Sequence, residues 1–168
     1  LKPQEQIDLF KFLSQLGKAG PFDASKANIA RVWNLQPATH QMEQFVSNKS
    51  ALPQLSPVKW GRVLSMVDGR LTSDLIRTGP SAGPWVGVVG VYVATKFNLA
   101  KAGSVILNLE GANGAPAWVD GKLLEGREGV PMQVSLGEGE HTLTVRLDPK
   151  ALPKHLRAES SDVTFLTQ

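Results

Sequence analysis

Few residues in this chain have the type and spacing that chemistry requires. The chain has no cysteine, which excludes disulfides, thiolate metal sites and nucleophilic cysteine chemistry. His40, His141 and His155 form no i, i+4 pair and have no carboxylate at metal-ligand spacing, so no metal site is predicted. His141 starts a predicted strand with the same parity as Leu143, and we expect it to be a partly buried structural histidine.

Nucleophilic and paired-carboxylate catalysis also find no support in the sequence. A serine nucleophile elbow needs Gly-x-Ser-x-Gly, and the nearest string, Gly103-Ser104-Val105, lacks the second glycine. Glycoside hydrolysis needs two carboxylates that face each other across a cleft. The available carboxylates lie in or beside predicted turns, where they are normally solvated: Glu110, Asp120, Glu125, Glu128 and Asp148. No catalytic residue is predicted, and a hydrolase or redox enzyme ranks last among the functions considered.

Tryptophan side chains offer the best candidates for ligand binding. Sugar-binding sandwiches present an aromatic ring beside hydrogen-bonding groups, because a pyranose has an apolar face and a polar rim. Trp85 follows a loop rich in glycine and proline, and Trp118 precedes the Asp120-Gly121 turn. Packing in the core or against a hairpin is nevertheless favoured over an exposed position for both rings. The candidate ligand-binding set is Trp85, Trp118, Asp120, Arg127 and Glu128.

Composition limits the class of protein and its partners. The 168 residues fit one domain of ordinary size or one domain with a small appendage, and the hydrophobic fraction of 42% is enough for a core. The net charge is only +3 and the basic residues are scattered, so no nucleic-acid partner is predicted. No segment approaches the roughly 20 apolar residues of a membrane helix, so no membrane insertion is predicted.

The first 20 residues predict a helix followed by a linker. Pro3 and Glu5 suit a first helical turn, Ile7, Phe10 and Leu13 recur at helical spacing, and Gly17 suits the end. This helix is too apolar to stand alone in water. The chain also starts without Met or a signal-peptide pattern, so we expect a fragment of a larger protein.

Residues 22–168 predict one β domain. A strand over Ile29–Leu35, a short helix over Thr39–Val46 and a loop over Asn48–Pro57 come first. From Trp60 onward apolar residues alternate with polar ones, and Asp68-Gly69 predicts a hairpin whose second strand continues through Leu75. Further strands are predicted over residues 88–98, 105–109, 117–119, 130–136, 142–148, 156–160 and 163–167, with a second hairpin at Asp120-Gly121.

This series of short strands is typical of an antiparallel β-sandwich or jelly roll, here with an N-terminal helix. The absence of an alternating strand–helix–strand pattern argues against a Rossmann-like fold. The predicted domains are therefore a helix and linker over residues 1–20 and a β-sandwich over residues 22–168.

Two stretches resemble known families. Residues 8–18 (DLFKFLSQLGK), followed by Gly20-Pro21-Phe22-Asp23, resemble the final helix of a c-type cytochrome domain and the C-terminal part of the large haem-binding, membrane-associated dehydrogenase-like proteins of planctomycetes. Residues 118–122 (WVDGK) and 139–145 (GEHTLTV) are similar to a strand–turn–strand pattern of PEGA-like and galactose-binding-like β-sandwich modules. That second pattern is structural and carries no catalytic residue.

The first resemblance implies an exported parent protein, either periplasmic or extracellular. The cytochrome family attaches haem through Cys-x-x-Cys-His, which this chain lacks, so no cofactor is expected here and haem c belongs upstream in the parent. We expect a non-catalytic accessory or interaction module whose partners are neighbouring domains of the parent. The alternative is a carbohydrate-binding module that uses an exposed tryptophan.

Overall fold

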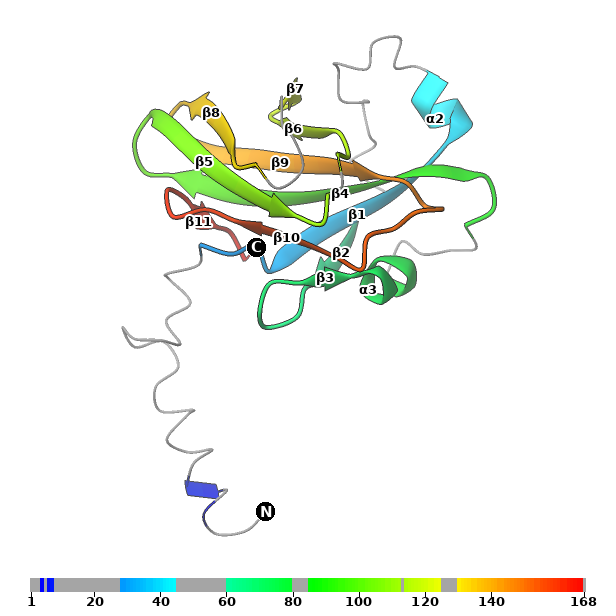
Figure 1. Cartoon of the computed structure of the whole chain (residues 1–168), viewed down its shortest axis with the longest axis horizontal. Coiled ribbons are helices and arrows are strands. Elements are labelled where there is room, and N and C mark those ends of the chain that lie inside the picture. Colours follow the sequence, from blue (N-terminus) through cyan, green and yellow to red (C-terminus); the bar gives the residue numbers. More distant parts are fainter. Residues whose placement is uncertain are drawn as a thin grey trace.

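The structure, a computed structural model, describes residues 4, 6, 7, 28–44, 60–79, 85–112, 114–124 and 130–167. These residues form two antiparallel β-sheets that face each other in a sandwich-like arrangement (Figure 1). The predicted mainly β, antiparallel class is therefore confirmed.

The larger sheet has the strand order β2-β1-β4-β9-β6-β7, and β11 pairs with the end of β4. All of these pairings are antiparallel. The strands are β1 (Val32–Thr39), β2 (Gly61–Leu64), β4 (Val88–Leu99), β6 (Ala117–Val119), β7 (Lys122–Leu123), β9 (Gly139–Leu147) and β11 (Thr164–Phe165).

The smaller sheet has the order β3-β10-β5-β8. Two short helices accompany the sheets: α2 (His40–Gln44) follows β1, and α3 (Ser73–Thr78) follows β3. The strands of the smaller sheet are β3 (Leu71–Thr72), β5 (Gly103–Glu110), β8 (Met132–Leu136) and β10 (His155–Glu159).

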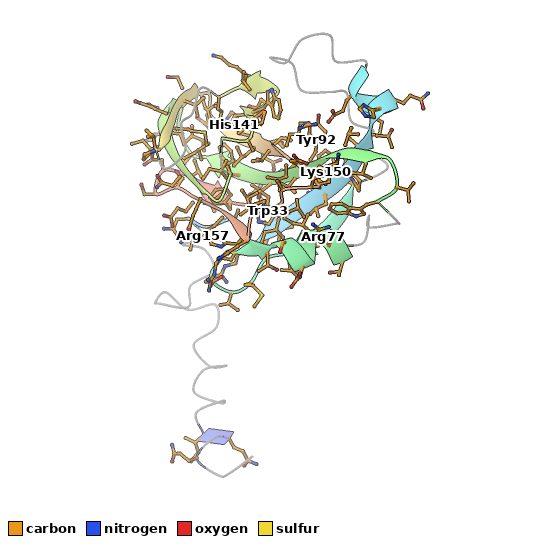
Figure 2. The ribbon with its side chains drawn as sticks, turned by 45° about the vertical axis from the view of Figure 1, so that its right-hand side comes forward. Trp33, Arg77, Tyr92, His141, Lys150 and Arg157 are labelled. Atoms are coloured by element: carbon orange, nitrogen blue, oxygen red, sulfur yellow. The ribbon has the colours of Figure 1, made fainter. Side chains whose placement is uncertain are left out.

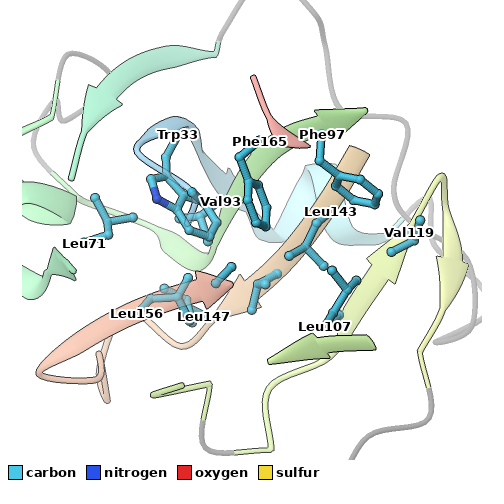
Figure 3. Close-up of a cluster of buried hydrophobic side chains, with 14 of the residues drawn as sticks. Trp33, Leu71, Val93, Phe97, Leu107, Val119, Leu143, Leu147, Leu156 and Phe165 are labelled. Atoms are coloured by element: carbon cyan, nitrogen blue, oxygen red, sulfur yellow. The ribbon is translucent and has the colours of Figure 1, made fainter. Parts of the chain in front are cut away.

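The core lies between the inner faces of the two sheets. Successive side chains of a strand point to opposite faces, so alternate residues of β4 enter the core, among them Val91, Val93 and Phe97. Figure 3 shows Phe97 of the larger sheet in one cluster with Leu107 and Leu156 of the smaller sheet. The alternation predicted over residues 88–98 and 105–109 is thus the alternation that fills the core.

The turn at Asp68-Gly69 forms as predicted, but the prediction that it joins paired strands is wrong. Gly69 has φ +85°, and its N–H donates to the Met66 carbonyl oxygen at 2.8 Å. β2 pairs with β1 in the larger sheet, whereas β3 pairs with β10 in the smaller sheet. The turn therefore carries the chain from one sheet to the other.

The predicted strand through Leu75 is also wrong, because helix α3 begins at Ser73. Thr72 caps the helix: its side-chain oxygen accepts a hydrogen bond from the Leu75 N–H at 3.4 Å. Asp74 in the first turn and Arg77 in the last suit the helix dipole. Local capping thus outweighs the weak period-two pattern of this segment.

Strand β1 is longer than the predicted strand over Ile29–Leu35, because it continues through Pro37 to Thr39. Proline has no N–H to donate, which usually ends an internal strand. Here the pairing of β1 with β2 reaches only Leu35, and beyond that residue, within the described part of the chain, β1 pairs with β4 alone. Pro37 therefore lies where β1 has a neighbouring described strand on one side only, and a proline is tolerated there. The predicted helix after Thr39 is present as α2, up to the limit of the described residues.

The predicted N-terminal helix lies largely outside the described residues. Gln4, Gln6 and Ile7 are described, and they are helical and exposed. The loop predicted over residues 48–57 also lies outside the described residues.

Candidate functional site

Trp118, a candidate for sugar stacking, is buried. It is 2% exposed and packs in a small cluster with Ala38 and Tyr92, whose ring centroid lies 6.4 Å from that of Trp118. The parity of β6 places Ala117 and Val119 in the main core and Trp118 on the outer face of the larger sheet. That face is covered by the partly buried Met42, Trp60 and Leu123, so Trp118 offers no exposed platform. The ring is packed, as the sequence favours, and the alternative of an exposed ring at this position does not hold.

Trp85 is half-buried against the main core, just before β4. The guanidinium carbon of Arg77, on α3, lies 5.4 Å from the centre of its indole ring, which is cation–π distance. One face of the ring is therefore occupied by a side chain of the protein itself. No contact joins Trp85 to Trp118 among the described residues, which places the two candidate rings in separate clusters.

Asp120 stabilises a turn and a strand. It has φ +50° at the β6–β7 turn, which confirms the predicted hairpin at Asp120-Gly121. Its Oδ1 accepts the Thr142 N–H at 2.8 Å, and its Oδ2 lies 2.6 Å from His141 Nδ1. Its carboxylate is thus directed to β9 and not to the Trp118 ring. Arg127 and Glu128, the other two members of the predicted set, lie outside the described residues.

His141 lies between two hydrogen-bond acceptors. Its Nδ1 faces Asp120, and its Nε2 lies 3.0 Å from the Gly137 carbonyl oxygen, while the Phe97 ring packs against it with a centroid separation of 5.6 Å. The hydrogen bond to Asp120 raises the pKa of His141 above its usual value, and the Gly137 carbonyl adds to this. Since both ring nitrogens are engaged, the arrangement suits a structural histidine, as predicted.

A cluster that the sequence analysis did not predict lies on the outer face of the larger sheet. Glu43 of α2 forms a two-point ion pair with Arg146 of β9, with Nε–Oε1 at 2.7 Å and Nη2–Oε2 at 2.9 Å. Arg146 also donates to the Val89 carbonyl oxygen, and the Tyr92 hydroxyl lies 3.3 Å from Glu43 Oε1. Glu43 and Arg146 are 103 positions apart, so no local sequence pattern could have joined them.

This cluster is partly shielded from water, and the pKa values of Tyr92 and Arg146 are raised within it. Burial, with the nearby Glu43 carboxylate, raises the pKa of Tyr92 to about 12. The hydrogen bonds to Glu43 raise the pKa of Arg146 further above its already high value. Gly90 lies beneath the pair, where a Cβ would overlap with the Glu43 carboxylate. The glycine therefore makes room for the contact that attaches α2 to the sheet.

Breaking this ion pair should destabilise the fold measurably. We expect Arg146→Met and Glu43→Gln each to lower the free energy of unfolding by about 1.5–3 kcal/mol, because each leaves a half-buried charged or polar partner unsatisfied. Urea unfolding measures these changes. The double variant should lose less free energy of unfolding than the two single variants lose together, since the partners interact directly.

An exposed pair provides the matched control. Lys96 and Glu140 lie 4.0 Å apart with more than half of each side chain exposed, so Lys96→Met should change stability by about 0.5 kcal/mol or less. Equal losses for Arg146→Met and Lys96→Met would contradict a specific role for the Glu43 contact.

The outer face of the smaller sheet carries interleaved charges. His155 Nε2 lies 2.9 Å from Glu110 Oε1, and this hydrogen bond lowers the pKa of Glu110. Arg157, labelled in Figure 2, contacts Glu159 at 2.6 Å and donates to the Asp68 carbonyl oxygen at 3.0 Å. Glu110 is exposed, whereas His155, Arg157 and Glu159 are partly buried. These contacts join neighbouring side chains of β5 and β10.

Among the described residues, no three histidine, aspartate or glutamate side chains converge in a way that could hold a metal ion. No helix among the described residues is long and apolar enough to cross a membrane.

No protein-family model, curated protein or solved structure matches this chain. The two resemblances noted in the sequence therefore stay predictions.

Proposed function

We propose that this chain is a non-catalytic interaction module of a larger exported protein. The observation that carries the proposal is a group of exposed apolar side chains at the end of β2 and in the turn that follows. Leu64, Met66 and Val67, here named the β2 apolar patch, are 60%, 53% and 84% exposed. Single exposed apolar residues are normal on protein surfaces, whereas neighbouring ones are more typical of a contact surface.

The position of the patch in the fold supports a neighbouring domain of the parent as its partner. The Ser65 N–H, within the patch, donates to the Arg31 carbonyl oxygen at 2.9 Å, and Ile29 lies beside Gly69. The chain therefore enters the β domain next to the patch. A domain attached there would have a high effective concentration at the patch, so a modest apolar surface could hold it.

The pairing of ionisable side chains supports a non-catalytic role. Glu43 binds Arg146, Asp120 binds His141 and Glu110 binds His155, in each case within 3.0 Å. In His141 both ring nitrogens are engaged, so neither is free to exchange a proton with a substrate. The carbohydrate alternative has weaker support, because Trp118 is buried and Arg77 lies over Trp85.

The same proposal includes a jelly-roll or galactose-binding-like class for the fold and a haem-containing parent protein. A jelly-roll or galactose-binding-like sandwich is consistent with two antiparallel sheets that share one core. A haem-containing, periplasmic or extracellular parent follows from the resemblance of residues 8–18. A Cys-x-x-Cys-His motif directly upstream in the gene would support that parent, and a Met-initiated product starting near Leu1 would contradict it.

Methionine oxidation offers a direct test of docking, because the three methionines differ in exposure. In the isolated chain we expect peroxide to oxidise the exposed Met66 several times faster than the buried Met132. In the full-length gene product, Met66 should be protected by a neighbouring domain, while the rate at Met132 stays the same. Peptide mass spectrometry after timed exposure measures both rates in one sample.

Two results decide the outcome of this test. A Val67→Asp variant of the full-length protein should restore rapid oxidation of Met66, because a buried charge opposes docking. The corresponding control, Val86→Asp, changes an equally exposed valine outside the patch and should leave Met66 protected. Equal Met66 rates in the full-length and isolated proteins would overturn docking at this patch.

A further inference from the structure

His141 connects two turns at one end of the larger sheet. Asp120 belongs to the turn between β6 and β7, and Gly137 belongs to the turn between β8 and β9. The His141 ring lies between them, with Nδ1 at 2.6 Å from Asp120 Oδ2 and Nε2 at 3.0 Å from the Gly137 carbonyl oxygen. Only 10% of its side chain is exposed, so water has limited access to replace either contact.

Both partners of the ring are hydrogen-bond acceptors, so the protonation state of the ring decides how many of the two hydrogen bonds it can donate. A neutral imidazole carries one N–H and can donate to only one of them, whereas an imidazolium donates to both. The neutral ring should keep its proton on Nδ1, because the bond to a carboxylate is charge-assisted. Its Nε2 lone pair would then face the Gly137 carbonyl lone pairs, and the two groups would repel each other.

Other charged groups near His141 are directed elsewhere. Phe97 of β4 presents an apolar ring to the imidazole, and Asp120 is the charged group that contacts it among the described residues. Lys96 and Glu140 pair with each other, and strand parity places them on the opposite face of the sheet. Lys122 of β7 is exposed, and Glu138 lies in the β8–β9 turn itself. Protonation of His141 is therefore governed mainly by Asp120.

We propose that His141 is a pH-dependent latch that ties the β8–β9 turn to the β6–β7 turn. When the ring is protonated, both turns are held, and when it loses its proton, the Gly137 contact is released. The β8–β9 turn is able to respond, because Gly137 and Gly139 flank Glu138 and Gly139 already has φ +118°. The partner of the Gly137 carbonyl, and with it the conformation of the turn, thus depends on pH.

The direction of the pH effect follows from linkage. The pKa of His141 is raised in the folded protein, so the protonated ring contributes stability that is complete below the unfolded value of about 6.5. That contribution is lost as the pH rises through the folded value. The latch is therefore closed in acid and opens toward alkaline pH.

NMR titration of the whole chain between about pH 5 and pH 9.5 tests the latch, a range chosen to span the ordinary histidine pKa. We expect His141 to titrate above the ordinary histidine value of about 6.5, and the Gly137 and Gly139 amide signals to shift with the same midpoint as His141. His40→Gln is the control and should leave that midpoint unchanged. A His141 midpoint at or below about 6.5, or turn signals that do not follow it, would overturn the proposal.

Two variants separate the latch from a general pH effect on the turn. Asp120→Asn keeps a residue that tolerates a positive φ but removes the charge, so the midpoint of His141 should fall. His141→Gln should abolish the shared transition of the Gly137 and Gly139 signals. The wild-type titration alone decides the matter if either variant fails to fold, because it needs no substitution.

Discussion

Replacing Trp33 with alanine is expected to lower the free energy of unfolding by about 3–5 kcal/mol. Trp33 is fully buried on the inner face of β1, and Figure 3 shows it in the core with Val93 and Phe165. Its removal would leave a cavity in the middle of the main hydrophobic cluster. Urea unfolding followed by circular dichroism measures the loss.

Trp33→Phe is the matched variant. It keeps an aromatic ring in the same place and removes an indole N–H that is buried and has no hydrogen-bond partner in the described part of the chain. We therefore expect it to be clearly less destabilising than the alanine variant. A loss for Trp33→Ala no larger than that for the exposed Val86→Ala would show that the core is not organised around this side chain.

Replacing Gly111 with alanine is expected to destabilise the protein by about 3 kcal/mol, through two effects that add. Gly111 has φ +79°, a conformation that is unfavourable for alanine. In addition, a Cβ at this position would overlap with the carbonyl oxygen of His155, a backbone atom of β10 that cannot easily move aside. Thermal or urea unfolding reports the change.

Gly114, in the same loop, separates the two effects. It has φ +75°, but a Cβ there would meet nothing within 4 Å. Gly114→Ala should therefore cost only the backbone term of about 1–2 kcal/mol. If the two variants prove equally stable, the close approach of Gly111 to β10 is not a real constraint on the fold.

The elements that could be predicted are those whose signal is local. The alternation along β4 and β5 and the Asp120-Gly121 turn need only neighbouring residues to be recognised, and all three are present in the structure. The side of each strand that faces the core also follows from parity. A structural role for His141 was predicted from the same parity.

The features that could not be predicted depend on which strands become neighbours. Pro37 interrupts a strand pattern in sequence, but its place beyond the pairing with β2 makes it harmless. The Asp68-Gly69 turn has the composition of a hairpin, yet its flanking strands find partners in different sheets. Parity alone places Trp118 on an outer face, and only the tertiary structure shows that this face is covered.

The pairing of the two ends of the described β domain has a consequence for how the protein folds. The Ser160 N–H donates to the Asn28 carbonyl oxygen, Ile29 bridges Glu159, and β11 completes the edge of β4. The first two contacts join residues 132 and 130 positions apart (160 − 28 and 159 − 29), and such non-local pairing slows folding. During synthesis, residues 28–30, which precede β1, reach these partners only after β10 has left the ribosome. Until then the apolar side chains of Ile29 and Ala30 lack their partners in the smaller sheet, and apolar surface exposed during this interval favours aggregation.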